Sequence, residues 1–164
     1  MKILLLLALI SLSMAACLNR TVAINRAMEW VNAKIPYNAQ AYHDGYVQGC
    51  EGIVGYGWEF PKPGVYSGDL MTQGWCKKIP KDELAMGDIM VCPGSHQLLF
   101  HSWVDSAKTQ YTAIELSPSG SNKHNLPYPY WSSYNPGCYV PCKVVKACAA
   151  EPGEIDLDEN IQME

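Results

Sequence analysis

The chain has 164 residues, a net charge of −4 and an apolar fraction of 48%, which suit one globular domain with a full-sized core. Its acidic residues gather at the end, because residues 151–164 hold six of the sixteen and no basic residue, which leaves +2 on residues 1–150. No basic stripe indicates nucleic-acid binding, so we expect no nucleic-acid partner. We expect the tail 151–164 to be disordered.

Residues 1–16 indicate a secretory signal peptide rather than part of the fold. A basic residue precedes the apolar run 3–10 and then a group of small residues, which is the order of such a signal, and the run is too short to span a bilayer. We therefore expect a secreted protein, or a periplasmic one if the cell is bacterial, with no membrane contact after cleavage. The alternative is a lipoprotein signal with Cys17 as the lipidated residue.

Two helices are expected in the first part of the domain, which we place at residues 17–150. Apolar residues recur at helical spacing over residues 21–35, with Thr21 as the cap and Pro36 as the stop. Loop residues follow. A second helix is predicted to start at Cys50 and to run to residue 60.

Four strands are expected in the second part, at residues 87–92, 96–104, 110–116 and 138–148, separated by turn-rich segments. Pro141 in the last of them is typical of an edge strand. Helices followed by strands predict an α+β fold, in which the helices pack on an antiparallel sheet.

Seven cysteines are an odd number, and most thiols pair in an oxidising compartment, so at least one is unpaired if all seven remain in the mature chain. Lipidation of Cys17 would leave six and would require no free thiol. Spacing alone does not give the pairing. We expect Cys138, Cys142 and Cys148 to tie the last strand to earlier segments.

Cys50 is the candidate nucleophile because it stands at a predicted helix start. Backbone N–H groups there favour the thiolate and lower a cysteine pKa to between about 3.5 and 7.5. A thiol hydrolase also needs an imidazole to take the proton, and a polar group to orient that ring. His96 opens a strand and can face a helix N-terminus, whereas alternation places His101 on the opposite face.

Glu115, in the following strand, is the candidate for the orienting group. A hairpin turn centred near residues 105–106 would bring Glu115 opposite His96. A turn centred at Ala107 would instead bring Ser117 or the next residue there. Each candidate also has a plain structural interpretation: a disulfide, a satisfied core histidine or an edge-strand carboxylate. No zinc-ligand spacing occurs, so we expect no metal and no cofactor.

Four stretches, in order, resemble the NlpC-type cell-wall peptidases, which are papain-like cysteine hydrolases of peptidoglycan stem peptides. They are "IPYNAQAYHDGYVQGCEGIVGYGW", "ELAMGDIMV", "SHQLLFHSWVDSAKTQYTAIELS" and "PYPYWSSYNPGCYV", and the resemblance covers about residues 23–145. It implies a papain-like fold with the nucleophile helix packed on the sheet. It also implies that Cys50 is the nucleophile, His96 the base and Glu115 the orienting residue.

The same resemblance implies an oxyanion or substrate-binding role for Tyr37, Tyr46, Gly49 and Glu51. The sequence departs from the family here, because the family's Asp-Cys-Ser-Gly is Gly49-Cys50-Glu51-Gly52. Losing the aspartate removes an anion that could meet a substrate amine, and the glutamate adds one at the next position.

The resemblance therefore implies a monomeric, secreted cysteine amidase that cleaves peptidoglycan peptides next to a D-isoglutamyl residue. Two alternatives remain open at this point. One is an inactive cell-wall-binding module, which the altered residues beside Cys50 suggest. The other is a thiol acyl hydrolase or transferase that acts on another amide or on a lipid.

Overall fold

The computed structural model describes residues 17–130 and 137–147; the predicted signal peptide and acidic tail lie outside these residues. The elements in chain order are α1 (Arg20–Asn32), β1 (Asn38–His43), β2 (Tyr46–Gln48), α2 (Cys50–Trp58), β3 (Cys76–Lys78), the 3₁₀ turn η1 (Lys81–Glu83), β4 (Ile89–Cys92), β5 (His96–Trp103), β6 (Gln110–Ser117), β7 (Gly120–Pro127) and β8 (Val140–Val144).

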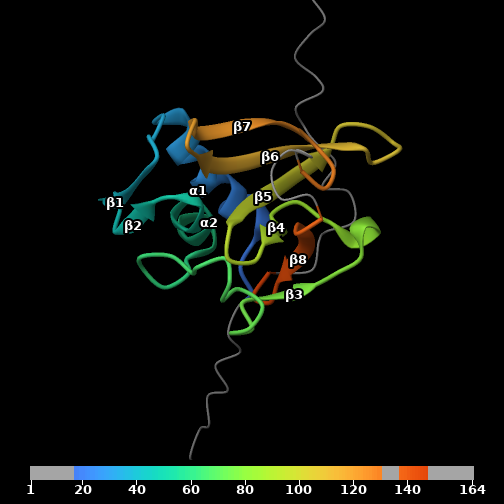
Figure 1. Cartoon of the computed structure of the whole chain (residues 1–164), viewed down its shortest axis with the longest axis horizontal. Coiled ribbons are helices and arrows are strands. Elements are labelled where there is room, and N and C mark those ends of the chain that lie inside the picture. Colours follow the sequence, from blue (N-terminus) through green and yellow to red (C-terminus); the bar gives the residue numbers. More distant parts are fainter. Residues whose placement is uncertain (1–16, 131–136, 148–164) are drawn as a thin grey trace, which may run out of the picture.

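One large sheet contains six of these strands in the order β3-β8-β4-β5-β6-β7, and each neighbouring pair is antiparallel. A separate antiparallel hairpin of β1 and β2 lies beyond α2, at the left of Figure 1. The predicted α+β class with helices before an antiparallel sheet is confirmed.

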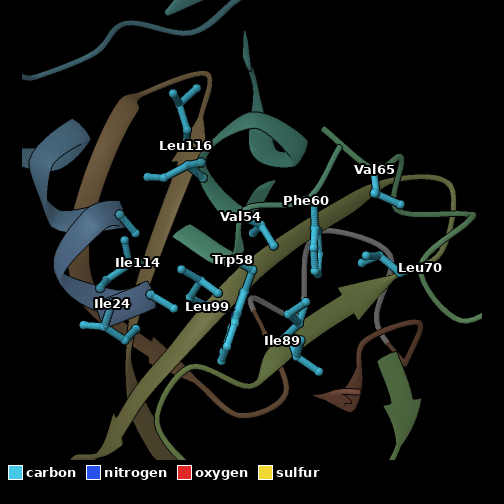
Figure 2. Close-up of a cluster of buried hydrophobic side chains, with 14 of the residues drawn as sticks. Ile24, Val54, Trp58, Phe60, Val65, Leu70, Ile89, Leu99, Ile114 and Leu116 are labelled. Carbon is cyan, nitrogen blue, oxygen red and sulfur yellow. The ribbon is translucent and has the colours of Figure 1, made fainter. Parts of the chain in front are cut away.

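Both helices cover one face of the large sheet. Figure 2 shows Ile24 of α1 and Trp58 of α2 packed towards Leu99 of β5 and Ile114 of β6, and all four are at most 3% exposed. These four side chains belong to one buried cluster, on the side of the sheet that we call the helix-covered face. Neighbouring residues of the same strands, such as Leu98, point the other way and form a second buried cluster, on the side that we call the second face.

The helix α1 begins one residue before the predicted cap. Asn19 is the cap, and its side chain accepts a hydrogen bond from the Val22 N–H at 3.2 Å, so the prediction of Thr21 was wrong. In α2, glycine is required where backbones meet. A Cβ on Gly52 would lie 1.7 Å from the Val47 carbonyl oxygen, and one on Gly57 would lie 2.8 Å from a carbonyl oxygen of α1.

The last strand is not at an edge. β8 lies between β3 and β4, so the prediction from Pro141 was wrong. Pro141 pairs with Met90 of β4, and its carbonyl oxygen accepts from the N–H of Ile79, just past the end of β3. In a strand, the N–H and the carbonyl of one residue point to the same neighbouring strand. The N–H that Pro141 lacks would therefore point to the place where β3 ends, and an inner strand tolerates a proline at this position.

Two disulfides close the β3–β8 end of the sheet. Cys76 pairs with Cys142, and Cys92 pairs with Cys138, so Cys138 and Cys142 tie the last segment to earlier ones as expected, whereas Cys148 lies outside the described residues. Each loop is long, 66 and 46 residues, and closing such a loop is worth about 4 kcal/mol in the chain-entropy account. Cys17 is also disulfide-bonded, which argues against its lipidation. These bonds fit an oxidising, extracellular compartment.

A buried ion pair joins α1 to the turn before β4. Arg20 Nη1 lies 2.8 Å from Asp88 Oδ1, with the two side chains 3% and 0% exposed, and the same nitrogen donates to the Met86 carbonyl oxygen at 2.7 Å. Burial raises the pKa of Asp88, and the Arg20 charge opposes that rise. Asp88 is thus a structural acid that depends on its cation.

Arg20→Met should destabilise the protein by about 3–5 kcal/mol, because it leaves the Asp88 carboxylate buried without its partner. Urea unfolding measures this free energy. Arg26→Met is the matched control, since Arg26 pairs with the exposed Glu59 and such pairs are worth about 0–1 kcal/mol. Equal losses in the two variants would contradict the assignment.

Candidate active site

The α2 helix carries Cys50 at its first residue, and Cys50 is the one free cysteine among residues 17–130 and 137–147. Gly49 before it is extended (φ −147°, ψ −179°) and provides no side-chain cap, so the helix tip is open next to the sulfur. The backbone N–H groups of Gln97 and Glu51 hydrogen-bond to the sulfur and favour its negative form. Gln97 is the second residue of β5, directly after His96, so its hydrogen bond places the sulfur next to the start of β5.

The thiol of Cys50 donates to Glu51 Oε2, with Sγ and Oε2 3.2 Å apart. Gly49 leaves room for this arrangement, because a Cβ on it would lie 3.0 Å from the same oxygen. Burial, followed by the negative charge and the hydrogen bond of Glu51, raises the pKa of the thiol to about 12, although the two N–H groups lower it. The sequence-based expectation of a lowered pKa was therefore wrong.

Glu51→Gln should increase the rate at which iodoacetamide alkylates Cys50 at pH 8. Removing the neighbouring charge lowers the thiol pKa, and a fall of one unit gives about tenfold more thiolate. Mass spectrometry of the modified peptide over time measures the rate. Glu83→Gln, at an exposed glutamate of η1, is the control and should leave the rate unchanged. An unchanged rate in Glu51→Gln would show that burial alone suppresses the thiolate.

His96, the first residue of β5, is held by Glu115 of β6. Its Nε2 lies 2.7 Å from Glu115 Oε2, and the two side chains are 11% and 2% exposed. A carboxylate only accepts, so Nε2 carries the hydrogen and Nδ1 of the neutral ring is left as the acceptor. The pair can therefore take a proton at Nδ1 and stabilise the resulting imidazolium, which is the work of a general base.

A β-bulge in β5 decides which face Glu115 shares with His96. The pairing of β5 with β6 shifts register between Phe100 and Ser102, where His101 is the extra residue. Because successive strand residues point to opposite faces, this one extra residue changes which residues of β6 share a face with a given residue of β5 beyond the bulge. His96 and Glu115 therefore share the second face, whereas an uninterrupted hairpin would place them on opposite faces.

The hairpin turn is centred at Ala107, because Trp103 pairs with Tyr111. This is the second of the two alternatives that the sequence left open, and together with the bulge it places Glu115 diagonal to His96 rather than opposite. Diagonal neighbours across antiparallel strands are within reach of long side chains, as the 2.7 Å contact shows.

Two further side chains, which the sequence-based analysis missed, complete the surroundings of Glu115. His124 Nε2 of β7 lies 2.8 Å from Glu115 Oε1, and the Tyr130 hydroxyl donates to Oε2 at 3.1 Å. Burial opposes ionisation of Glu115, but the hydrogen bonds from His124 and His96 outweigh it and lower the pKa of the carboxyl to about 2. Glu115 is therefore an anion at any physiological pH.

The remaining predicted residues lie in different surroundings. Gly49 and Glu51 flank Cys50. Tyr37, just before β1, is 46% exposed. Tyr46 is 5% exposed, its hydroxyl donates to the Phe60 carbonyl oxygen at 2.8 Å, and its ring contacts that of an α2 tyrosine. These contacts give Tyr46 a packing role.

Within the described residues, no three His, Cys, Asp or Glu side chains are grouped as metal ligands, and no helix is long and apolar enough to cross a bilayer. In comparisons with known proteins, no family model and no curated protein matches this chain.

Proposed function

We propose that the protein is a thiol hydrolase with a papain-like arrangement of Cys50, His96 and Glu115. More particularly, we propose a secreted NlpC-type cell-wall peptidase that cleaves peptidoglycan stem peptides next to a D-isoglutamyl residue. The observation that carries the proposal is the buried His96–Glu115 pair at the strand start that also borders the free sulfur of Cys50. The order of the four sequence motifs supports the family and its substrate.

The reaction begins when the Cys50 thiol gives its proton to His96 Nδ1. The sulfur then attacks the scissile carbonyl carbon, and the negative charge that develops on its oxygen is met by the Cys50 backbone N–H. This N–H belongs to the first turn of α2, where backbone N–H groups have no acceptor within the helix.

The tetrahedral intermediate collapses when its carbon–nitrogen bond breaks and His96 returns the proton to the leaving amine. A water molecule then attacks the thioester while His96 takes its proton. Release of the carboxylic acid returns that proton to the sulfur. Throughout, Glu115 holds the ring by Nε2 and stabilises its charged form.

The resting thiol is directed at Glu51, so the mechanism requires the Cys50 side chain to turn from Glu51 to His96. We expect rotation about χ1 to another staggered position to supply this motion. A ligand that occupies the Glu51 carboxylate would remove the competing acceptor.

Digestion of defined peptidoglycan fragments, with mass spectrometry of the products, tests the proposed function. We expect new amino and carboxyl termini at one stem-peptide amide, and no product from protein first alkylated at Cys50. Cleavage of lipid or another amide without cleavage of any stem peptide would replace the proposed substrate with the acyl hydrolase or transferase alternative.

A cell-wall-binding module without turnover is the second candidate. The thiol's hydrogen bond to Glu51 and its raised pKa favour it, because both oppose formation of the nucleophile. Protein that sediments with purified cell walls, yet releases no fragment between pH 4 and pH 9, would decide for this candidate.

A further inference from the structure

Glu115 receives hydrogen bonds on both carboxylate oxygens from three parts of the chain. His96 of β5 and the Tyr130 hydroxyl meet Oε2, whereas His124 of β7 meets Oε1. The weaker contact of the Tyr130 hydroxyl with Oε1, at 3.5 Å, leaves His124 as the principal donor to that oxygen. His124 plays no part in the proposed reaction, so its place behind the carboxylate needs its own explanation.

We propose that His124 is a positioning residue, which fixes the Glu115 carboxylate so that Oε2 stays in line with His96 Nε2. This inference rests on the proposed function, since it assigns a role in orienting the base of that reaction. His124 acts through Glu115 and touches neither Cys50 nor the scissile bond.

The torsional freedom of glutamate gives the physical reason. Its terminal carboxylate turns in a broad, twofold energy well, so a hydrogen bond to one oxygen alone does not hold the plane. A second donor on Oε1 blocks that rotation. His124 is suited to this because β6 and β7 pair without a break from Gln110 to Ser117, so its position on β7 relative to Glu115 is set by the ladder.

His124 differs from the other groups around Glu115 in its exposure. Its side chain is 39% exposed, whereas His96 is 11% and Glu115 is 2% exposed. Replacing a half-exposed side chain costs little packing, so variants at position 124 are suited to separating positioning from folding.

The titration of the Glu115 carboxyl carries the signature of this role. Groups facing the carboxylate are His96 from β5, His124 from β7, and the phenols of Tyr111 and Tyr130. The His124 hydrogen bond is one of the causes that lower the Glu115 pKa, so its loss raises that pKa. Protonation of Glu115 then removes the support of His96 at a higher pH than in the wild type.

His124→Ala and His124→Gln form the test, with the Glu115 carboxyl titrated from about pH 1 to pH 7 and with kcat and KM of stem-peptide cleavage measured separately. In His124→Ala the midpoint of the Glu115 titration should move up by about one to two pH units, the equivalent of one hydrogen bond to a charged group, and kcat should fall with KM unchanged. His124→Gln keeps an N–H donor and should restore the wild-type midpoint and kcat. Asn125→Ala, at the exposed neighbour on β7, should change nothing.

Direct titration of the Glu115 carboxyl carbon by NMR keeps this inference separate from the proposed function. A midpoint that rises in His124→Ala and returns in His124→Gln supports the role even if no substrate is cleaved, in which case the proposed function alone fails. Unchanged midpoints and unchanged kcat in both variants would overturn the inference. If His124→Ala does not fold, His124→Asn, whose shorter amide does not reach Glu115, serves in its place.

Discussion

Replacing Cys50 by alanine should reduce stem-peptide hydrolysis by about 10⁶-fold in kcat, which is the scale of losing the nucleophile in a protease triad. The reason is that no thioester forms without this sulfur, so His96 and Glu115 have no nucleophile to activate and no thioester to hydrolyse. Initial rates from mass spectrometry of released fragments measure the loss.

Cys50→Ala should leave the fold intact, because the free thiol makes hydrogen bonds only with Glu51 and Gln97 and closes no loop. Circular dichroism and a thermal melt that match the wild type are the control. Alkylation before and after the substitution provides a second one, since modification should disappear from α2 while the disulfide-bonded Cys76 and Cys142 stay unmodified in both proteins. Full activity in a folded Cys50→Ala protein would refute thiol catalysis.

Glu115→Gln has the second largest expected effect, a fall in kcat of up to about 10⁴-fold. An amide has the size of the carboxylate, but it turns its NH₂ to an imidazole nitrogen and so favours the tautomer with hydrogen on Nδ1. His96 would then present a hydrogen, rather than a lone pair, to Cys50. The carboxylate's stabilisation of the imidazolium is lost as well.

A steady-state comparison at the pH optimum measures this effect, with kcat and KM determined separately. We expect the loss in kcat, because Glu115 is 2% exposed, lies behind His96 and is not a substrate-binding group. Glu83→Gln, on the exposed 3₁₀ turn, is the charge-matched control. A change confined to KM would mean that Glu115 shapes the binding groove instead of orienting the base.

Local patterns predicted the elements that carry the first three candidate residues. Apolar spacing predicted α2 from Cys50 onward, and turn residues bounded the strands that became β4, β5 and β6. These signals lie within a few residues of each other, so short windows of sequence contain them.

Local patterns did not predict the strand β7, and they therefore did not indicate a role for His124. Its sequence, GSNKHNLP, is mostly polar, because β7 is an edge strand whose outward side chains meet water. A polar segment with glycine, asparagine and proline is typical of a loop. Pairing with β6, and not the residues' own preferences, makes this segment a strand.

The sequence by itself determined the α+β class, the strand on which His96 lies and the residue types available for thiol chemistry. Only the tertiary structure decided whether those residues meet. The bulge at His101 sets which face Glu115 shares with His96, and burial, with the carboxylate of Glu51, raises the thiol pKa against the helix tip. Register and burial arise from contacts between segments far apart in the chain, and no local pattern records them.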